Sequence, residues 1–332
     1  MALAYAALGD TLWTVRDEQG VETRQAHETV GRLEAVAATP ARPERVFVGT
    51  FEDGLQRSTD GGETFTRVGT AVVDADAVMA VAVSPHDPDV VWAGTEPSAV
   101  YRSADGGETW ESRSGLTDLP SSSGWSFPPR PDTHHVRWIE PDPREPERLY
   151  VGIEAGALVR TDDGGATWRD HPAGARRDNH TLATHPAAPD RIYTAAGDGF
   201  AVSRDGGESW NYPQDGLYHR YCWSVVADPG DPDRLVLSAA AGPRSAHSAS
   251  SAEAYIYRRV GDDPWRRVES DAVPTGEGAL RAVLAADTTA GGVYAVTDRG
   301  LARSSDGGAT WTAVVDWPDR VHGRTPRGLA VV

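Results

Sequence analysis

The chain alternates short runs of small apolar residues with turns that are rich in Gly, Pro and Asp. One such pair of runs covers residues 33–40 and 45–49, and a second pair covers residues 78–85 and 90–94. The first run of each pair is built from small apolar residues, the second is rich in Val and Tyr, and a third run enters a recurrent turn. Short strands at this spacing, with turn residues between them, predict four-stranded antiparallel units.

The recurrent turn is a phrase built on Asp-Gly-Gly, followed two residues later by Thr or Ser and then by an aromatic residue. Five intact copies occupy residues 58–65, 103–110, 161–168, 203–210 and 304–311. A worn sixth copy, residues 257–265, keeps Gly261 and Trp265. The interval between the fourth and fifth intact copies is long enough for two units, and the worn copy lies inside it. A repeat of this kind indicates one array and not a set of unrelated domains.

This phrase resembles the Asp-box, or BNR repeat, of sialidases, sortilin-type receptors, xyloglucan hydrolases and photosystem assembly factors. The resemblance covers nearly the whole chain and implies a β-propeller. The chemistry of the box is local, because its Asp can accept backbone N–H bonds across the turn, its second Gly supplies a positive φ, and its aromatic residue packs beside the hairpin. The box residues are therefore expected to hold a turn together and not to be catalytic.

The number of blades follows from the two ends of the chain. Six boxes alone would suggest six blades, but residues 12–20 predict a further hairpin without a box, and residues 327–332 match an inner strand that has no blade of its own. Joining the two ends completes the first blade. The predicted fold is all-β: a single seven-bladed β-propeller domain over residues 1–332, with four-stranded antiparallel blades and a C-terminal strand that closes the ring and leaves no free edge.

Composition limits the partners of this propeller. The net charge is -17, and all 32 basic residues are arginine. An acidic, lysine-free surface repels nucleic acid and anionic lipid, so we expect neither a nucleic-acid nor a membrane partner. Such a surface fits a salt-loving host, and GC-rich codon usage alone explains it equally well. Nothing in the sequence points to an oligomer, and a monomer is expected.

The first residues and the single cysteine bear on the compartment. Residues 1–20 lack the basic start and apolar core of a signal peptide and contain no membrane span, so a cytoplasmic location is expected. Cys222 is the single cysteine, which excludes an internal disulfide framework and fits a reducing compartment. It falls out of phase with the pore-facing positions described next and is expected to be a small buried hydrophobe.

Aligning the predicted inner strands on their closing turns stacks polar residues into two columns. The first column contains Glu34, Met79, Arg137, His180, Trp223, Arg281 and Arg327. The second, two residues earlier, contains Arg32, Ala77, His135, Asp178, Tyr221, Ala279 and Thr325. Because side chains alternate along a strand, both columns share a face and should ring the central pore at the end opposite the boxes. Insertions at 111–134 and 239–253 should hang over the same mouth, where long ordered loops are usually functional.

The predicted ligand-binding residues share a cationic or aromatic character and are Arg32, Arg137, Trp223, Arg281, Arg327 and His219. A cluster of arginines on an acidic protein favours a small anion, most simply a carboxylate or phosphate held bidentately by guanidinium. Trp223 could stack on a sugar or another planar ligand. The alternative is that these arginines pair with Glu34, Asp178 and Glu140 and merely line a wet channel.

The predicted acid–base residues are His135, His180, Tyr221, Glu34 and Asp178. His135, His180 and His219 form a candidate set for a divalent metal, although no HExxH motif or paired-cysteine spacing supports it. No cofactor is firmly implied.

Two classes of function stay open. The first is a glycosidase-like or lyase-like enzyme, or a binder, for a small anionic, carboxylated or carbohydrate ligand. Seven-bladed polysaccharide lyases pair His and Tyr as base and acid, and this chain is similar in residue type, whereas it lacks the Phe/Tyr-Arg-Ile-Pro start of sialidases. The second is a non-catalytic protein-interaction propeller, as in photosystem assembly factors. For the first class we expect His180→Ala and Arg137→Ala to abolish ligand binding and leave thermal stability nearly unchanged.

Overall fold

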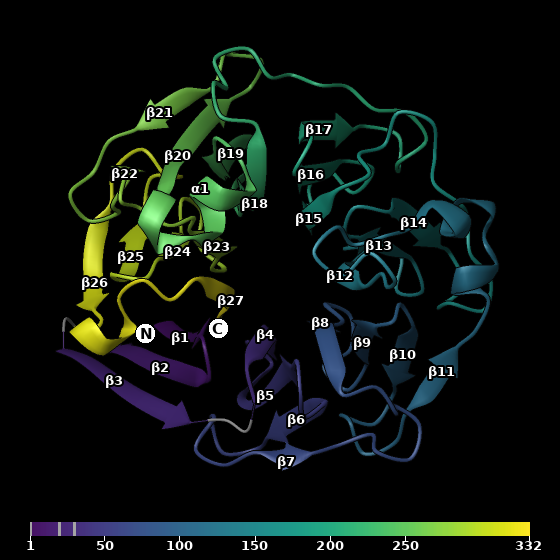
Figure 1. Cartoon of the computed structure of the whole chain (residues 1–332). Coiled ribbons are helices and arrows are strands. Elements are labelled where there is room, and N and C mark those ends of the chain that lie inside the picture. Colours follow the sequence, from purple (N-terminus) through teal and green to yellow (C-terminus); the bar gives the residue numbers. More distant parts are fainter. Residues whose placement is uncertain (1, 19–20, 29–30) are drawn as a thin grey trace.

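The computed structural model describes residues 2–18, 21–28 and 31–332, and these residues form seven β-sheets arranged in a ring (Figure 1). Each sheet is a blade whose innermost strand lies nearest the central axis. The seven-bladed propeller predicted from the repeat is therefore confirmed. Within the described ranges, no helix combines the length and apolar character needed to cross a membrane.

The blades follow the order of the sequence, apart from the strand that closes the ring. Blade 1 contains β27 (Pro326–Val331), β1 (Ala2–Leu8), β2 (Thr11–Glu18) and β3 (Val21–Glu28). Blade 2 contains β4 (Leu33–Thr39), β5 (Arg42–Thr50), β6 (Leu55–Ser58) and β7 (Thr66–Arg67). Blade 3 contains β8 (Ala77–Val83), β9 (Val91–Glu96), β10 (Val100–Ser103) and β11 (Glu111–Arg113).

The remaining four blades complete the ring. Blade 4 contains β12 (Val136–Pro141), β13 (Leu149–Ile153) and β14 (Ala157–Thr161), and blade 5 contains β15 (Asn179–Ala183), β16 (Ile192–Ala196) and β17 (Gly199–Ser203). Blade 6 contains β18 (Tyr221–Asp228), β19 (Asp231–Ala240), β20 (Glu253–Val260) and β21 (Arg266–Val268), with β22 (Gly276–Glu277) paired to β20. Blade 7 contains β23 (Val283–Ala286), β24 (Val293–Val296), β25 (Gly300–Ser304) and β26 (Thr312–Asp316).

The outermost strand is reduced in two blades. In blade 4 it survives as the bridge between Arg160 and Arg169, and in blade 5 as the bridge between Val202 and Asn211. Both bridges are followed within three residues by a proline, which has no N–H to donate to a ladder. The four-stranded prediction therefore holds for the other five blades among the described residues.

The ring closes at blade 1, as predicted. β27 pairs antiparallel with β1, placing Val331 opposite Ala4 and Leu329 opposite Ala6. Figure 1 shows the two ends of the chain side by side at this blade. The hairpin predicted at residues 12–20 is β2 with β3, although its tip, residues 19–20, lies outside the described residues.

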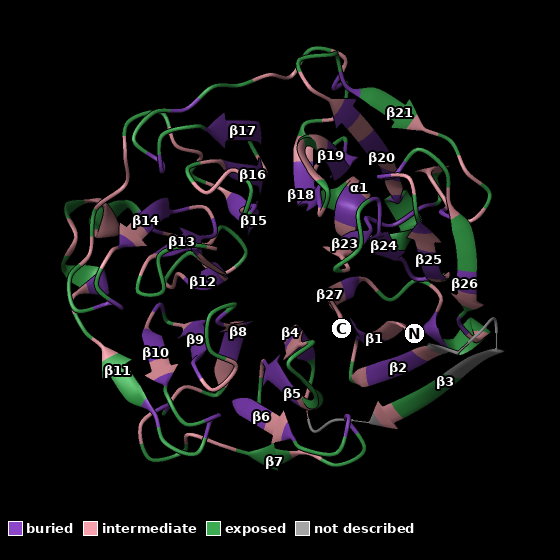
Figure 2. Ribbon diagram, turned by 180° about the vertical axis from the view of Figure 1, so that it is seen from behind, coloured by how far each residue is buried: buried purple, intermediate pink, exposed green. Residues whose placement is uncertain are grey.

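The hydrophobic core is divided among the interfaces between blades. Trp92 of blade 3 packs in one cluster with Val136 and Val151 of blade 4, and Trp13 of blade 1 shares a cluster with Tyr294 of blade 7. Figure 2 shows the inner and middle strands largely buried, whereas the outer strands β7, β11, β21 and β26 are largely exposed. Cys222 is fully buried, as predicted, and burial raises the pKa of its thiol.

The boxes hold their turns in the predicted way. In the second box, the backbone N–H of Thr109 donates to Oδ1 of Asp105 at 2.9 Å, and that of Gly107 donates to Oγ of Ser103 at 2.8 Å. Gly107 has φ 87°, in the left-handed region that favours glycine. The same pattern recurs in every intact box.

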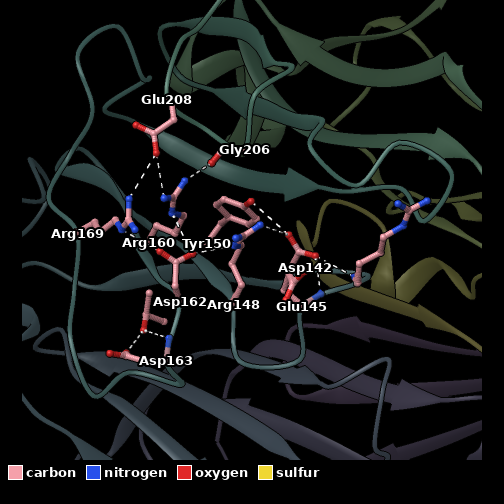
Figure 3. A network of polar contacts seen from close by, with 12 residues as sticks. Asp142, Glu145, Arg148, Tyr150, Arg160, Asp162, Asp163, Arg169, Gly206 and Glu208 are labelled. Atoms are coloured by element: carbon pink, nitrogen blue, oxygen red, sulfur yellow. Dashed lines mark hydrogen bonds and ion pairs between the residues drawn. The ribbon is translucent and has the colours of Figure 1, made fainter.

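Arginines connect consecutive boxes around the ring (Figure 3). Arg160 of blade 4 donates to the carbonyl of Gly206 in the next box and lies 3.0 Å from the carboxylate of Glu208. Arg57 and Arg258 reach the first glycine carbonyl of the next box in the same manner, at 2.8 and 2.9 Å. The boxes therefore act as structural clamps on one face of the ring, which leaves the opposite face to be searched for function.

Candidate functional site

The face opposite the boxes is formed by the starts of the inner strands and by the turns between second and third strands, because neighbouring strands run antiparallel. A cavity of about 200 Å³, here called the pore-mouth cavity, lies on this face. Its lining includes seven residues of the two predicted columns, namely Arg32, Glu34, Met79, His135, Arg137, Trp223 and Arg327. Phe127, Pro129 and Arg130 of the first insertion and His247 of the second complete the wall together with Glu154.

A wider opening adjoins this cavity over the joint between blades 1 and 2. It measures about 550 Å³ and shares Arg32 and Arg327 with the pore-mouth cavity. Asp10, Glu52 and Arg324 also line it. The two spaces together are large enough for a ligand of sugar size, and arginine side chains stand where they meet.

Trp223 lies under the arginines and is covered by them. The guanidinium carbon of Arg281 is 3.5 Å from its ring centre, that of Arg137 is 4.9 Å away, and the ring of His180 is 4.4 Å away. The side chain of Trp223 is only 2% exposed. Its indole therefore supports the guanidinium groups and does not present the open stacking face expected from sequence, since a ligand would meet the arginines first.

Arg281, His247 and Tyr221 form a chain of hydrogen bonds whose direction is fixed. Arg281 is always a donor, so the 3.2 Å contact from its Nε makes Nδ1 of His247 the acceptor. Nε2 of His247 then carries the proton and donates to the Tyr221 hydroxyl at 3.1 Å. Burial, and then the charge of Arg281, lower the pKa of His247 to about 2, and burial raises the pKa of Tyr221. The Tyr221 hydroxyl accepts in this chain, so its own proton remains available for another acceptor.

Glu34 binds two of the predicted arginines. Its carboxylate, buried at 1% exposure, lies 2.8 Å from Nε of Arg32 and 3.3 Å from Nη1 of Arg327. The pairing of arginines with Glu34, one of the three partners in the channel-lining alternative, is therefore present. Glu140 is not among them, because it accepts hydrogen bonds from Thr184 and from the indole of Trp138.

Glu154 is a site residue that the inner-strand alignment missed. It follows β13 and lies 2.9 Å from Nε2 of His135, 3.6 Å from Nε of Arg137 and 3.7 Å from Nε2 of His180. Burial alone would raise the pKa of this carboxyl, but the hydrogen bond from His135 and the positive charge next to it, including that of Arg137, outweigh burial and hold the pKa well below its usual value. Glu154 is the anionic centre around which the predicted histidines gather.

A sequence signal for Glu154 existed. In six blades, an acidic residue is the last residue of the second strand or lies within two residues of its end. These residues are Asp10, Glu52, Glu96, Glu154, Asp198 and Asp298. They face the same end of the ring as the columns, and Glu96 accordingly binds Arg130 through Nε at 2.7 Å.

His180 and Asp178 lie beside Glu154. His180 is fully buried, its Nδ1 is 2.6 Å from the carbonyl of Cys222, and its Nε2 is 3.8 Å from Oδ1 of Asp178. Burial lowers the pKa of His180 and raises that of Asp178. Among the described residues, Glu154, Asp178 and His180 are the set whose ligating atoms, all within 4.8 Å of one another, could hold a metal ion.

His219 is not brought to this site. Its ring stacks on Tyr255 at a centroid distance of 4.1 Å and forms a hydrogen bond with the hydroxyl of Tyr257. Both tyrosines belong to β20, the third strand of blade 6. The trio His135, His180 and His219 is consequently not assembled, whereas the other predicted residues lie in or next to the pore-mouth cavity.

Comparison with known proteins identifies the fold but not an activity. The sequence matches no protein-family model and no curated protein sequence. Among solved structures, the GH74 xyloglucanase of Xanthomonas campestris superposes with a TM-score of 0.65 at 17% identity, and the GH74 enzyme of Niastella koreensis with 0.64 at 16% identity. These matches cover 94% and 95% of this chain, which spans only 55% of either enzyme.

A second group of solved structures has a length closer to that of this chain. YCF48 from Cyanidioschyzon merolae superposes with a TM-score of 0.58 at 15% identity and covers 87% of this chain and 86% of its own. A structure described as YCF48 bound to D1 peptide gives 0.57 at 17% identity, covering 85% and 80%. The chain is thus a seven-bladed propeller structurally like GH74 enzymes and YCF48, and its function has to be argued from its own residues.

Proposed function

We propose that the pore-mouth cavity binds a small anionic ligand, carboxylated and sugar-like, and acts on it by glycosidase-like or lyase-like chemistry. The observation that carries this proposal is the position of Arg137. Its side chain is only 4% exposed, yet it lines the cavity together with Arg32, Arg130 and Arg327. Such a group of guanidinium ions on a protein of net charge -17 is a local reversal of charge.

The carboxylates at the cavity do not balance these arginines. Arg130 pairs with Glu96, but Glu34 is shared by Arg32 and Arg327, and Glu154 is shared by Arg137 and His135. Burying an arginine without a full partner is costly, and a carboxylate that binds it bidentately offsets that cost. A ligand carboxylate would complete the charge balance, which is why an acidic ligand is preferred to a neutral one.

An elimination reaction fits the donors and acceptors around such a ligand. Nε2 of His135 donates to Glu154, so Nδ1 carries the lone pair. Nδ1 is buried 3.4 Å from Oε2 of Glu96, a carboxylate that would stabilise the imidazolium once Nδ1 has taken a proton. In a uronate, the C–H bond next to the carboxylate would break, its proton passing to His135 and its electron pair forming a C=C bond. The C–O bond to the leaving sugar would break, and the leaving oxygen would take the hydroxyl proton of Tyr221. Arginine bound to the carboxylate would stabilise the intermediate anion.

The experiment is a calorimetric titration with acidic oligosaccharides of galacturonate or glucuronate and with their neutral counterparts. Arg327→Ala is the informative variant because the Arg327 side chain is 29% exposed. The matched control is Arg67→Ala, because Arg67 lies on the outermost strand β7 of its blade and pairs with Asp76. We expect binding of the acidic sugars only, a loss of at least about tenfold in affinity for Arg327→Ala, and no change for the control. Equal affinity for acidic and neutral sugars would refute the proposal. Ultraviolet absorbance of an unsaturated product reports turnover, which Tyr221→Phe should abolish.

A non-catalytic interaction module is the second candidate. It is favoured by the match to YCF48, because this chain covers 86% of that protein but only 55% of the GH74 enzyme of Niastella koreensis. In the same calorimeter, saturable binding of an acidic peptide without binding of any sugar would support this candidate. The arginines of the mouth would then hold peptide carboxylates and not a substrate.

A further inference from the structure

Three side chains with metal-ligating atoms converge between blades 4 and 5, next to the pore-mouth cavity. Glu154 follows β13, Asp178 precedes β15, and His180 lies on β15. Nε2 of His180 is 3.7 Å from Oε1 of Glu154 and 3.8 Å from Oδ1 of Asp178. We propose that these three residues bind a divalent transition-metal cation of the zinc or manganese kind.

The hydrogen bonding of His180 directs a lone pair at the two carboxylates. A backbone carbonyl can only accept, so the 2.6 Å contact between Nδ1 of His180 and the carbonyl of Cys222 places a proton on Nδ1. In the neutral imidazole, Nε2 then has a lone pair and no hydrogen. Nε2 is buried and has no hydrogen-bond partner. A lone pair held against two anionic oxygens is repulsive unless a cation lies between them.

A proton alone would not relieve this repulsion. Hydrogen bonds from nitrogen to oxygen measure about 2.7–3.2 Å, so an N–H at Nε2 would reach neither carboxylate at the observed separations. A metal ion bonded to both atoms at about 2.0–2.2 Å spans N···O separations of roughly 3.4 Å at a tetrahedral angle and more at wider angles. The observed 3.7 and 3.8 Å fall in that range.

Each of the three side chains is also held in orientation by a second contact. The Nδ1–H of His180 on a backbone carbonyl is the arrangement that fixes the tautomer of most metal-binding histidines. The N–H of Ala155 donates to Oδ1 of Asp178 at 2.9 Å, and His135 binds the second oxygen of Glu154 at 2.9 Å. Ala155 adopts φ 52°, a left-handed conformation that alanine rarely takes, and in doing so directs its N–H at Asp178.

The ligand set and its place define the chemistry. One imidazole nitrogen and two carboxylate oxygens suit Zn²⁺ or Mn²⁺, and three protein ligands leave at least one position open for water or substrate. Glu154 also lines the pore-mouth cavity, so the metal site adjoins the space where a ligand would bind. The cation would add positive charge to the arginine cluster, but its binding does not depend on the proposed carboxylated ligand.

The experiment measures metal binding to the full chain without any sugar. The protein is stripped with a chelator, titrated with Zn²⁺, Mn²⁺ or Co²⁺ in a calorimeter, and analysed for bound metal by mass spectrometry. Asp178→Asn is the test variant because its amide oxygen can still accept from Ala155, and Asp198→Asn, a carboxylate of the same blade paired with Arg176, is the matched control. The visible spectrum of bound Co²⁺ reports its ligands.

We expect one metal ion per chain and a higher Tm when the metal is bound. Asp178→Asn should bind the metal at least tenfold more weakly and change the Co²⁺ spectrum, whereas Asp198→Asn should do neither. Metal binding that Asp178→Asn leaves unchanged would place the cation elsewhere and overturn the proposal, as would the absence of stoichiometric binding. A thermal melt of the stripped variant, expected to match the stripped wild type, separates loss of a ligand from loss of fold. Because sugar titrations can be run in chelator, failure of this site and failure of the proposed function are distinguishable.

Discussion

The guanidinium carbon of Arg281 lies over the ring of Trp223, 3.5 Å from the ring centre, and both side chains are buried. Trp223 lies on β18 of blade 6, and Arg281 precedes β23 of blade 7. Arg137 belongs to blade 4, and its guanidinium carbon is 4.9 Å from the centre of the same indole ring. A cation over an aromatic face is attracted by the ring quadrupole, and more strongly when water is excluded. Trp223 therefore joins three blades at the hub and offsets part of the cost of burying two arginines.

Trp223→Ala should lower the free energy of unfolding by about 3–5 kcal/mol, because a large buried side chain is lost and two guanidinium groups lose their partner. Guanidinium chloride denaturation followed by fluorescence measures the change. Tyr218→Ala, at a position 83% exposed, is the control and should stay close to wild type. A loss for Trp223→Ala no larger than that of the control would contradict the role of the indole.

Arg137→Ala should destabilise the protein by about 3 kcal/mol, since it leaves Glu154 buried with one cation fewer. His180→Ala should also lower Tm, because this side chain is fully buried. These expectations replace the sequence-based one, in which both variants kept their stability. Differential scanning calorimetry in chelator is the measurement, and the double variant with Glu154→Gln should recover part of the Arg137→Ala loss. An additive double variant would mean that the two side chains are not coupled.

Asp105→Ala should cost about 1–2 kcal/mol, because the carboxylate accepts from the backbone of Thr109, from its hydroxyl and from Ser103. Glu108→Ala is the matched control in the same box, since the Glu108 side chain is 67% exposed and pairs with Arg57 at the surface. Urea denaturation should show a shift for the first variant and a change within about 0.5 kcal/mol for the second. An unshifted curve for Asp105→Ala would remove the structural role of the box.

Acid should unfold the protein partly through the boxes. Hydrogen bonds that Thr109 donates, first from its hydroxyl and then from its backbone N–H, lower the pKa of Asp105 to about 2, and those from Thr167 do the same for Asp163. An unfolded aspartate titrates near 3.9, so this contribution is complete above about pH 4 and is lost as pH falls toward 2. Tm measured between pH 6 and pH 2 should fall most steeply below pH 4. The profile of Asp105→Ala should be flatter, and an identical slope would refute the assignment.

The sequence was informative wherever a strict period operates. Side chains alternate along a strand, so the alignment of the inner strands correctly places Glu34, Arg137 and Trp223 at one cavity wall. Arg130 and Glu154 were missed because they lie outside the strands, where no period relates position to direction, and His247 because it ends the short helix α1 (Pro243–His247) inside an insertion. The number of blades was predictable because the two ends of the chain together make one repeat: the N-terminal segment supplies three strands of blade 1, and the C-terminal segment supplies the fourth.

His219 shows the limit of the same method. It lies two residues before Tyr221 and would share the pore face if the strand extended that far. β18 begins at Tyr221, however, and the chain before it does not continue the alternation. His219 instead stacks on Tyr255. His219 was misplaced because the alternation of side chains holds only within the hydrogen-bonded strand, and His219 lies before that strand begins.

The pairing of β27 with β1 has a consequence for biosynthesis. These strands are separated by almost the entire chain, and Val331 must find Ala4 before the circle is complete. A ribosome that has delivered six and a half blades holds a nascent chain whose first strand still lacks its inner neighbour. The main-chain donors and acceptors of β1 are then available to other strands. Closure can occur only after β27 has been synthesised, and until then the inner edge of β1 is a site at which other strands can pair.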